Sequence, residues 1–134
     1  MICLERVSVY LDLRFIYNDF LTSYIFLGLT DNHCQQICTL LKQHAKQDVD
    51  NLDLGNNKIT DIGILELCKA LADTEVTRLV ISNNKLTDKC CEQVTGVLMR
   101  NKHLTVLNMQ DNQITSRVAK NKLVNALPKI DVVI

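Results

Sequence analysis

The sequence predicts an α/β solenoid, in which short parallel strands and helices alternate along one axis. The first observation behind this prediction is a pattern of alternating apolar residues, followed by an Asn and a Thr, that occurs three times. The second is the spacing of the copies, which is 27 and then 28 residues. A fixed period of roughly 20–50 residues is typical of repeat architectures, whose units stack to bury a shared core.

Each copy of the pattern predicts a strand and the turn that follows it. In the first copy, Leu52 and Leu54 alternate with Asp53, which places the two leucines on one face of a strand and the aspartate on the other. The copies span residues 52–60, 79–87 and 107–115, and each has a further apolar residue three positions upstream: Val49, Val76 and Leu104. The consensus is apolar-x-x-apolar-x-apolar-x-x-Asn-x-apolar-Thr.

The Asn of each copy stands where the chain must turn away from its strand. Buried backbone N–H and C=O groups at such a turn need hydrogen-bond partners, and an Asn side chain offers one acceptor and two donors. We therefore expect Asn57, Asn84 and Asn112 to form a structural ladder between stacked repeats rather than to bind a ligand.

These motifs resemble the repeats of the ribonuclease-inhibitor-like class of leucine-rich repeat proteins, whose unit is about 28 residues long and contains a full helix. The resemblance is strong over residues 49–115 and extends over 29–134. It implies a right-handed βα superhelix that forms a short horseshoe segment, with the parallel sheet on the concave face and the helices on the convex face. It says little about function, because this fold serves many unrelated partners.

Helices are expected over residues 30–47, 61–73 and 88–100, where apolar residues recur at helical spacing. A Thr-Asp pair opens each one, and the Asp complements the helix dipole. A fourth, shorter helix should end before Pro128, because proline interrupts helices. Residues 130–134 then predict a last strand, with Ile130 and Val132 in the buried positions and Leu127 as the counterpart of Leu104.

The chain is expected to form one domain over residues 1–134, with repeats over 29–127 and a terminal strand over 128–134. Residues 1–28 are irregular and contain all six aromatic residues, which suggests an aromatic-rich cap or degenerate repeat, an aromatic docking surface, or a repeat broken by truncation of a longer protein. Two alternatives remain for this segment. Either a strand at 9–14 is followed by an insertion of about eleven residues, or a degenerate second strand lies near Thr22–Phe26.

Several classes of function find no support in the sequence. The four glycines are dispersed, the three histidines are scattered, and no metal-ligand spacing is present, so we expect no enzyme, cofactor or metal site. His33 and His103 are interpreted as surface residues, and the six cysteines as free buried thiols. No membrane span or secretory signal is visible, which favours a cytoplasmic, intracellular protein.

Charge is uneven along the chain. Residues 1–75 contain 6 basic and 11 acidic residues, whereas residues 76–134 contain 9 and 4. A nucleic-acid site would combine clustered basic residues with aromatic side chains for stacking. All aromatic residues lie at the opposite end of the chain, so we do not expect nucleic-acid binding.

The solvent face of the sheet is the usual recognition surface of such solenoids, and its expected rows can be read from the repeats. The rows are Asn51, Arg78, Val106 and Lys129; Asp53, Val80, Asn108 and Asp131; and Gly55, Ser82, Gln110 and Val133. The candidate partner-binding residues are Asn51, Asp53, Arg78, Val80, Ser82, Asn108 and Gln110.

We therefore predict a protein–protein interaction module whose partner is a protein of unknown identity. One alternative is a regulatory segment of a longer protein, because the resemblance implies relatives among Ran GTPase-activating proteins and innate sensors. The other is a self-associating scaffold that uses the unpaired edge of the C-terminal strand to form a homo-oligomer.

Overall fold

The computed structural model describes residues 21–23, 28–43 and 50–134. Within these ranges, strands and helices alternate along the chain. They are β1 (Leu21–Ser23), α3 (Asp31–Gln43), β2 (Asn51–Asp53), α4 (Asp61–Leu71), β3 (Arg78–Val80), α5 (Asp88–Leu98), β4 (Val106–Asn108), α6 (Arg117–Ala126) and β5 (Asp131–Val133).

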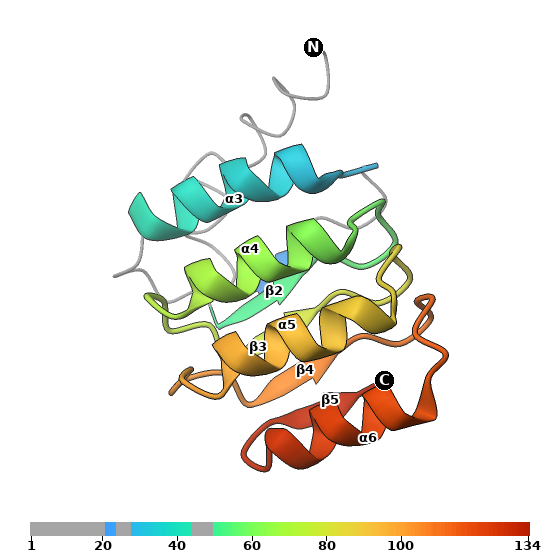
Figure 1. Cartoon of the computed structure of the whole chain (residues 1–134). Coiled ribbons are helices and arrows are strands. Elements are labelled where there is room, and N and C mark those ends of the chain that lie inside the picture. The colour runs from blue at the N-terminus through green and yellow to red at the C-terminus, as the bar shows by residue number, and fades with distance from the viewer. Residues whose placement is uncertain (1–20, 24–27, 44–49) are drawn as a thin grey trace.

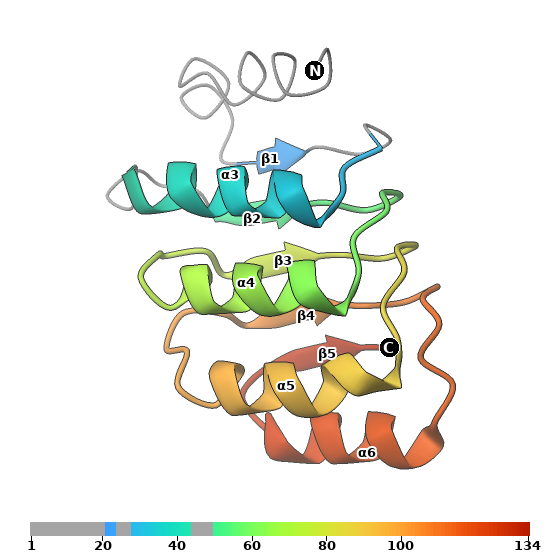
Figure 2. The same ribbon diagram turned by 45° about the horizontal axis from the view of Figure 1, so that its top comes forward.

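The strands form one parallel five-stranded sheet in the order β1-β2-β3-β4-β5. The helices α3 to α6 lie side by side along one face of this sheet, as both views of the ribbon show (Figure 1, Figure 2). Each unit therefore adds one strand and one helix to a growing stack. This arrangement confirms the predicted α/β repeat solenoid.

The core lies between the sheet and the helices, and the repeating apolar residues fill it. Leu52, Leu79 and Leu107 occupy equivalent strand positions in register, and each is at most 1% exposed. Burying one such side chain contributes about 1.5–3 kcal/mol. From the helices, Ile64 and Leu67 meet this row and are fully buried. The alternation seen in the sequence is thus the alternation between core and solvent.

An aspartate at the start of one helix accepts a hydrogen bond from the N-cap residue of the next helix, and this contact repeats along the solenoid. Asp31 accepts from the backbone N–H of Thr60 at 2.8 Å, and Asp61 accepts from that of Thr87 at 2.7 Å. Thr60 and Thr87 are the N-caps of α4 and α5. The sequence predicted a role for these aspartates at the starts of their own helices, but not this link to the next helix. The signal was present, because a Thr-Asp pair recurs at residues 30–31, 60–61 and 87–88.

His33 takes the corresponding role at the first described helix. Its Nδ1 accepts from the backbone N–H of Thr30 at 2.9 Å, where the later repeats use an aspartate from the preceding unit. Its side chain is only 8% exposed. The prediction of a surface His33 is therefore wrong. The residue is buried, and its ring accepts a hydrogen bond from the backbone at the start of α3. His103 is exposed, as expected.

The structure shows a strand in one of the two places that the sequence left open. β1 pairs with β2 in parallel, and Thr22 lies opposite Leu52. This agrees with a degenerate strand near Thr22. The possible strand at 9–14 and the expected aromatic cap lie outside the described residues, except for the part of residues 1–28 that forms β1.

The last strand, β5, lies within the predicted residues 130–134, but its register with β4 differs by two residues from the expected rows. Asp131 pairs with Val106, and Val133 pairs with Asn108. The expected positions of Lys129 beside Val106 and of Asp131 beside Asn108 are therefore wrong. The cause is a turn in which Ile130 N–H donates to Leu127 C=O at 3.0 Å, so that strand pairing begins only at residue 131. Counting from Leu127 could not reveal this turn.

Candidate protein-interaction face and its supporting ladders

The face of the sheet that no described helix covers, called here the helix-free face, brings the predicted binding residues together. The sheet register places Asn51 beside Arg78, and Asp53 beside Val80. On the next strand, Asn108 follows Val80 in the same row. Neighbouring strands lie about 4.8 Å apart, so these side chains form one continuous surface. Ser82 and Gln110 lie just beyond the ends of their strands.

Two polar residues of this face also support the backbone. Asp53 Oδ1 accepts from Gly55 N–H at 2.9 Å, and Asn108 Oδ1 accepts from Gln110 N–H at 3.0 Å. Part of their hydrogen-bonding capacity is therefore used within the turn. Between them, Val80 is only 9% exposed and offers little apolar surface to a partner. The sequence predicted that the row of Asp53, Val80 and Asn108 is exposed to solvent. In the structure Val80 is buried and the other two are partly buried.

Arg78 is a charged residue on the helix-free face. Its side chain is exposed, and no ion pair joins it to any described residue. Beside it, Asn51 Oδ1 is buried and has no hydrogen-bond partner among the residues that the structure describes. An unpaired guanidinium next to an unsatisfied acceptor is a polar recognition element, and arginine is enriched at the energetic centres of protein interfaces.

The Asn side chains at the strand ends join neighbouring repeats through hydrogen bonds. Asn84 Oδ1 accepts from Ile59 N–H at 3.0 Å, and its Nδ2 donates to Ile81 C=O at 3.2 Å in its own repeat. Nδ2 also donates to Leu54 C=O at 3.0 Å in the preceding repeat. Asn57 Oδ1 accepts from Leu29 N–H, and Asn112 Oδ1 from Leu86 N–H, in the same way. We propose a structural role for all three, because their polar atoms are engaged with the backbone.

The residue before each ladder Asn has a left-handed backbone conformation. The φ angles are 58° at Asn56, 50° at Asn83 and 56° at Asp111. Asn and Asp tolerate this region better than most residues, so the recurring polar residue at this position has a backbone explanation. This left-handed conformation turns the backbone from the sheet toward the next helix. Ser82 and Gln110 come just before the turn, at the rim of the helix-free face.

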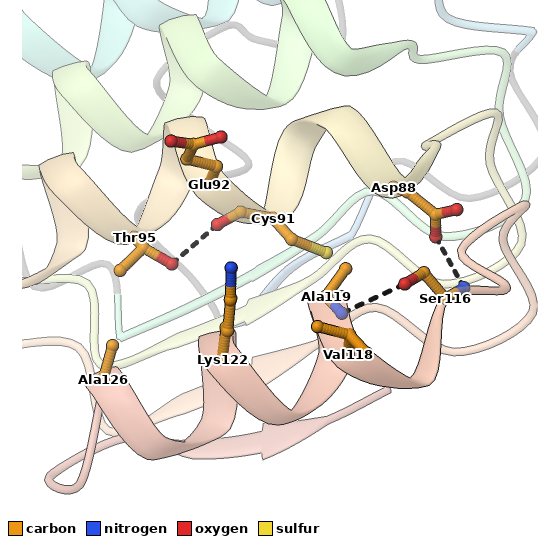
Figure 3. Close-up of a pocket in the computed structure, with 9 residues that line it drawn as sticks. All are labelled: Asp88, Cys91, Glu92, Thr95, Ser116, Val118, Ala119, Lys122 and Ala126. Atoms are coloured by element: carbon orange, nitrogen blue, oxygen red, sulfur yellow. Dashed lines mark hydrogen bonds between the residues drawn. The ribbon is translucent and has the colours of Figure 1, made fainter.

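A cavity opens on the opposite side of the molecule, between α5 and α6, with a volume of about 550 Å³. Figure 3 shows side chains of the two helices facing one another across it, with Lys122 of α6 extending toward α5. Val118, which lines this cavity, is 64% exposed. The lining residues are Asp88, Cys91, Glu92, Thr95, Ser116, Val118, Ala119, Lys122 and Ala126.

All five cysteines in the described residues are free and buried, as expected; Cys3 lies outside these residues. Burial raises the pKa of Cys38 to about 11 and that of Cys68 to about 12. Cys91 differs, because the hydrogen bond with the neighbouring Cys90 thiol holds its pKa below the usual value. Cys91 also lines the cavity between α5 and α6.

We expect Cys91 to be the first of these five thiols to react with a small alkylating reagent. The thiolate is the reactive form, so a lowered pKa increases its population near neutral pH, whereas the raised pKa values of Cys38 and Cys68 suppress theirs. A short iodoacetamide pulse at pH 7.5 or so, followed by peptide mass spectrometry, measures the order. Earlier labelling of Cys38 or Cys68 than of Cys91 would contradict this prediction.

Among the described residues, no group of three or more His, Cys, Asp or Glu side chains is arranged to hold a metal ion. In the same part of the chain, no helix is long and apolar enough to cross a membrane.

Comparison with known proteins agrees with the repeat architecture. A family model described as "Leucine Rich repeat" matches residues 51–68 and 100–117. The chain is 32% identical over 90 residues to mouse (Mus musculus) "NACHT, LRR and PYD domains-containing protein 5", a match that covers 66% of this chain and 8% of that protein. It is 32% identical over 88 residues to pig (Sus scrofa) "Ribonuclease inhibitor", covering 64% of this chain and 19% of that protein.

The chain thus spans less than a fifth of the length of these curated relatives. Among solved structures, "Leiomodin-1 Actin-Binding Site 2 (ABS2)" has a similar fold, with a TM-score of 0.76 and 17% sequence identity. That match covers 98% of this chain and 76% of the leiomodin chain. The repeat pattern, the one-strand-one-helix stack and these matches lead to one conclusion. The chain is a leucine-rich repeat protein of the ribonuclease-inhibitor-like class.

Proposed function

We propose that the chain is a protein-interaction module that binds its partner through the helix-free face of the sheet, with Arg78 as the central contact. The observation that carries this proposal is the exposed Arg78 side chain, which has no ion-pair partner among the described residues and lies beside the unsatisfied Asn51 Oδ1. The exposed guanidinium is available to form an ion pair with a carboxylate of a partner.

The comparisons support an interaction role in general terms. One relative is named as an inhibitor of a ribonuclease, and the structural neighbour is named as an actin-binding site. Neither name identifies the partner of this chain, because the first match spans a small part of the inhibitor and the second rests on fold alone. The proposal assigns no catalytic step to the protein. The free thiols favour a reducing compartment for it, since disulfides form in oxidising ones.

The charge-reversal variant Arg78→Glu tests this proposal. Proteins retained from cell extract by immobilised wild-type chain and by the variant are quantified side by side by mass spectrometry. We expect the specific partner to be retained at least about tenfold less by the variant, because loss of a central interface arginine costs roughly 2 kcal/mol or more. Arg78 is exposed, so the fold should be unaffected.

Arg117→Glu is the matched control, because Arg117 is also exposed but lies on α6, away from the helix-free face. A protein lost with Arg78→Glu and kept with Arg117→Glu supports the proposal. Equal loss with both variants would point to net charge rather than to a binding face, and equal retention would remove Arg78 from the account.

A second candidate function is self-association through the outer edge of β5. Asp131 N–H donates to Thr105 C=O, and Met109 N–H donates to Val133 C=O. Because successive residues of a parallel strand alternate in direction, the backbone groups of Val132 point away from β4. Val132 and Ile134 are also half-buried rather than buried. An exposed strand edge of this kind can pair with a second copy.

Sedimentation velocity over a range of protein concentrations tests this second candidate. Val132→Pro removes the outward N–H while leaving the bonds from Asp131 and Val133 to β4 in place. A concentration-dependent dimer that becomes a monomer in Val132→Pro, with an unchanged circular dichroism spectrum, would support edge pairing. A wild-type chain that stays monomeric, or a dimer that persists in the variant, would refute it.

A further inference from the structure

The chain passes from α5 to β4 at one edge of the solenoid (Figure 1). A basic hollow lies beside this connection. Its volume is about 660 Å³. A second, smaller hollow of about 190 Å³ adjoins it, since both are lined by Met99, Asn101 and Lys129. The larger hollow is completed by Arg100, Lys102, Leu104 and Thr105, and the smaller one by Leu98, Ala126, Leu127, Pro128 and Ile130.

Three cations converge on the larger hollow without a counter-charge. Arg100, Lys102 and Lys129 all line it and are exposed, and no aspartate or glutamate lines either hollow. No ion pair joins these three side chains to any described residue. The C-terminus of α5 contributes about half a negative charge nearby, which three full positive charges exceed. The local field therefore favours an anion.

The repeat architecture does not require these cations. At the corresponding place after α4, the loop carries Asp73 and Glu75, so the charge has the opposite sign. The two loops do share a backbone-capping residue. Thr74 Oγ1 accepts from Val76 N–H at 3.5 Å, and Asn101 Oδ1 accepts from Leu104 N–H at 2.8 Å. The structural need is thus met by one polar side chain, and the basic residues are additional.

The smaller hollow has the properties of a pocket for one apolar side chain. Its lining includes Leu127, Pro128 and Ala126, and Met99 at its rim is 66% exposed. An engineered apolar cavity of about 150 Å³ binds benzene, so a hollow of about 190 Å³ accepts a group of similar size. An exposed methionine beside it is suited to this role, because its flexible side chain adapts to different shapes.

Asn101 lies in the wall that the two hollows share. Its Oδ1 accepts from His103 and Leu104 N–H, which fixes the orientation of the side-chain amide. Its Nδ2 is buried and has no hydrogen-bond partner among the described residues. An unsatisfied buried donor is unfavourable.

We propose that these two hollows form a binding site for an acidic peptide segment of a partner protein, with an apolar side chain next to one or two carboxylates. The apolar group occupies the smaller hollow, and the carboxylates lie among Arg100, Lys102 and Lys129. The site is independent of the helix-free face, because none of these residues belongs to it. It gives the module a second contact on the same partner or a contact with another one.

The probe is acetyl-Leu-Asp-Glu-amide, titrated into the ¹⁵N-labelled full chain and followed by two-dimensional NMR. We expect saturable shifts of the Asn101 side-chain amide and of the Arg100 and Lys102 backbone amides, which weaken as salt is raised. Acetyl-Leu-Asn-Gln-amide, which lacks the charges, and acetyl-Ala-Asp-Glu-amide, which lacks the large apolar group, should each bind at least about threefold more weakly. Shifts confined to other regions would overturn the proposal.

Two variants define the site further. Lys129→Gln should weaken binding of the acidic peptide about two- to fivefold, whereas Lys89→Gln, an exposed lysine near the start of α5, should leave it unchanged. Asn101→Asp keeps the acceptor for the loop but replaces the free donor by a negative charge, so it should abolish binding while the remaining spectrum stays folded.

A single-stranded RNA oligonucleotide and inorganic phosphate serve as the other probes. Binding of either one with higher affinity than the peptide, lost in Lys129→Gln, would overturn the proposal in favour of a phosphate site. A peptide that binds wild type and Lys129→Gln equally would also overturn it. Loss of this site would leave the result for Arg78→Glu unaffected, so the two proposals fail separately.

Discussion

Asn84→Ala is expected to lower the free energy of unfolding by about 3 kcal/mol. The carbonyls to which Asn84 Nδ2 donates mostly keep another donor: Leu54 C=O retains Asn57, and Ile81 C=O retains Asn112. Ile59 N–H, by contrast, loses the Asn84 Oδ1 acceptor that satisfies it in the buried turn. The cost therefore comes from one unsatisfied buried donor and from the space that the side chain leaves.

Urea unfolding followed by circular dichroism measures this difference. The matched control is Asn121→Ala, because Asn121 is exposed on α6 and alanine has the higher helix propensity. The control should be as stable as the wild type or slightly more stable. If Asn84→Ala were within about 0.5 kcal/mol of the wild type, the Asn ladder would not hold the repeats together.

Gly63→Ala is expected to destabilise the protein by about 2 kcal/mol, although the same change in most helices is stabilising. A methyl group at position 63 would overlap Asp31 Oδ1 and would lie 2.7 Å from Ile59 Cγ2, closer than carbon atoms approach without strain. Asp31 could then no longer hold the N-terminus of α4 through Thr60 and Gly63 N–H. The substitution would therefore disturb the packing of α4 against Ile59 and would also break the hydrogen bonds that Asp31 accepts.

Gly96→Ala is the control, because nothing lies within 4 Å of a Cβ built at that helical glycine. It should stabilise the protein by about 0.5–1 kcal/mol through the higher helix propensity of alanine. Thermal unfolding of the two variants should therefore give shifts of opposite sign. Stabilisation by Gly63→Ala would show that the contact between successive helix starts is looser than the structure indicates.

The sequence predicted those parts of the fold that follow from strict periodicity. Leu52, Leu79 and Leu107 kept the strand register because every repeat needs an apolar residue between sheet and helix. The helices α4 and α5 began at the Asp of the Thr-Asp pair for a similar reason. These features are local and repeated, so they can be read from spacing alone.

Features at the ends of the array, and contacts between repeats, were harder to predict. The register of β5 with β4 differs by two residues from the expected rows, because a turn at Ile130 delays the start of strand pairing. His33 replaced an aspartate that the pattern would have supplied, and no periodic signal marks such a replacement. The hollows beside Asn101 arise from two separate segments, residues 98–105 and 126–130, which are at least 21 positions apart in the sequence.

The central claim is that this module binds its partner through the helix-free face. The most direct test is site-specific photo-cross-linking from Ser82 on the rim of that face, compared with Lys89, which is exposed on α5. The account predicts that the protein retained by wild type and lost with Arg78→Glu cross-links at position 82 and not at position 89. Cross-linking of that protein at position 89 alone would contradict the account, because it would place the partner on the helices.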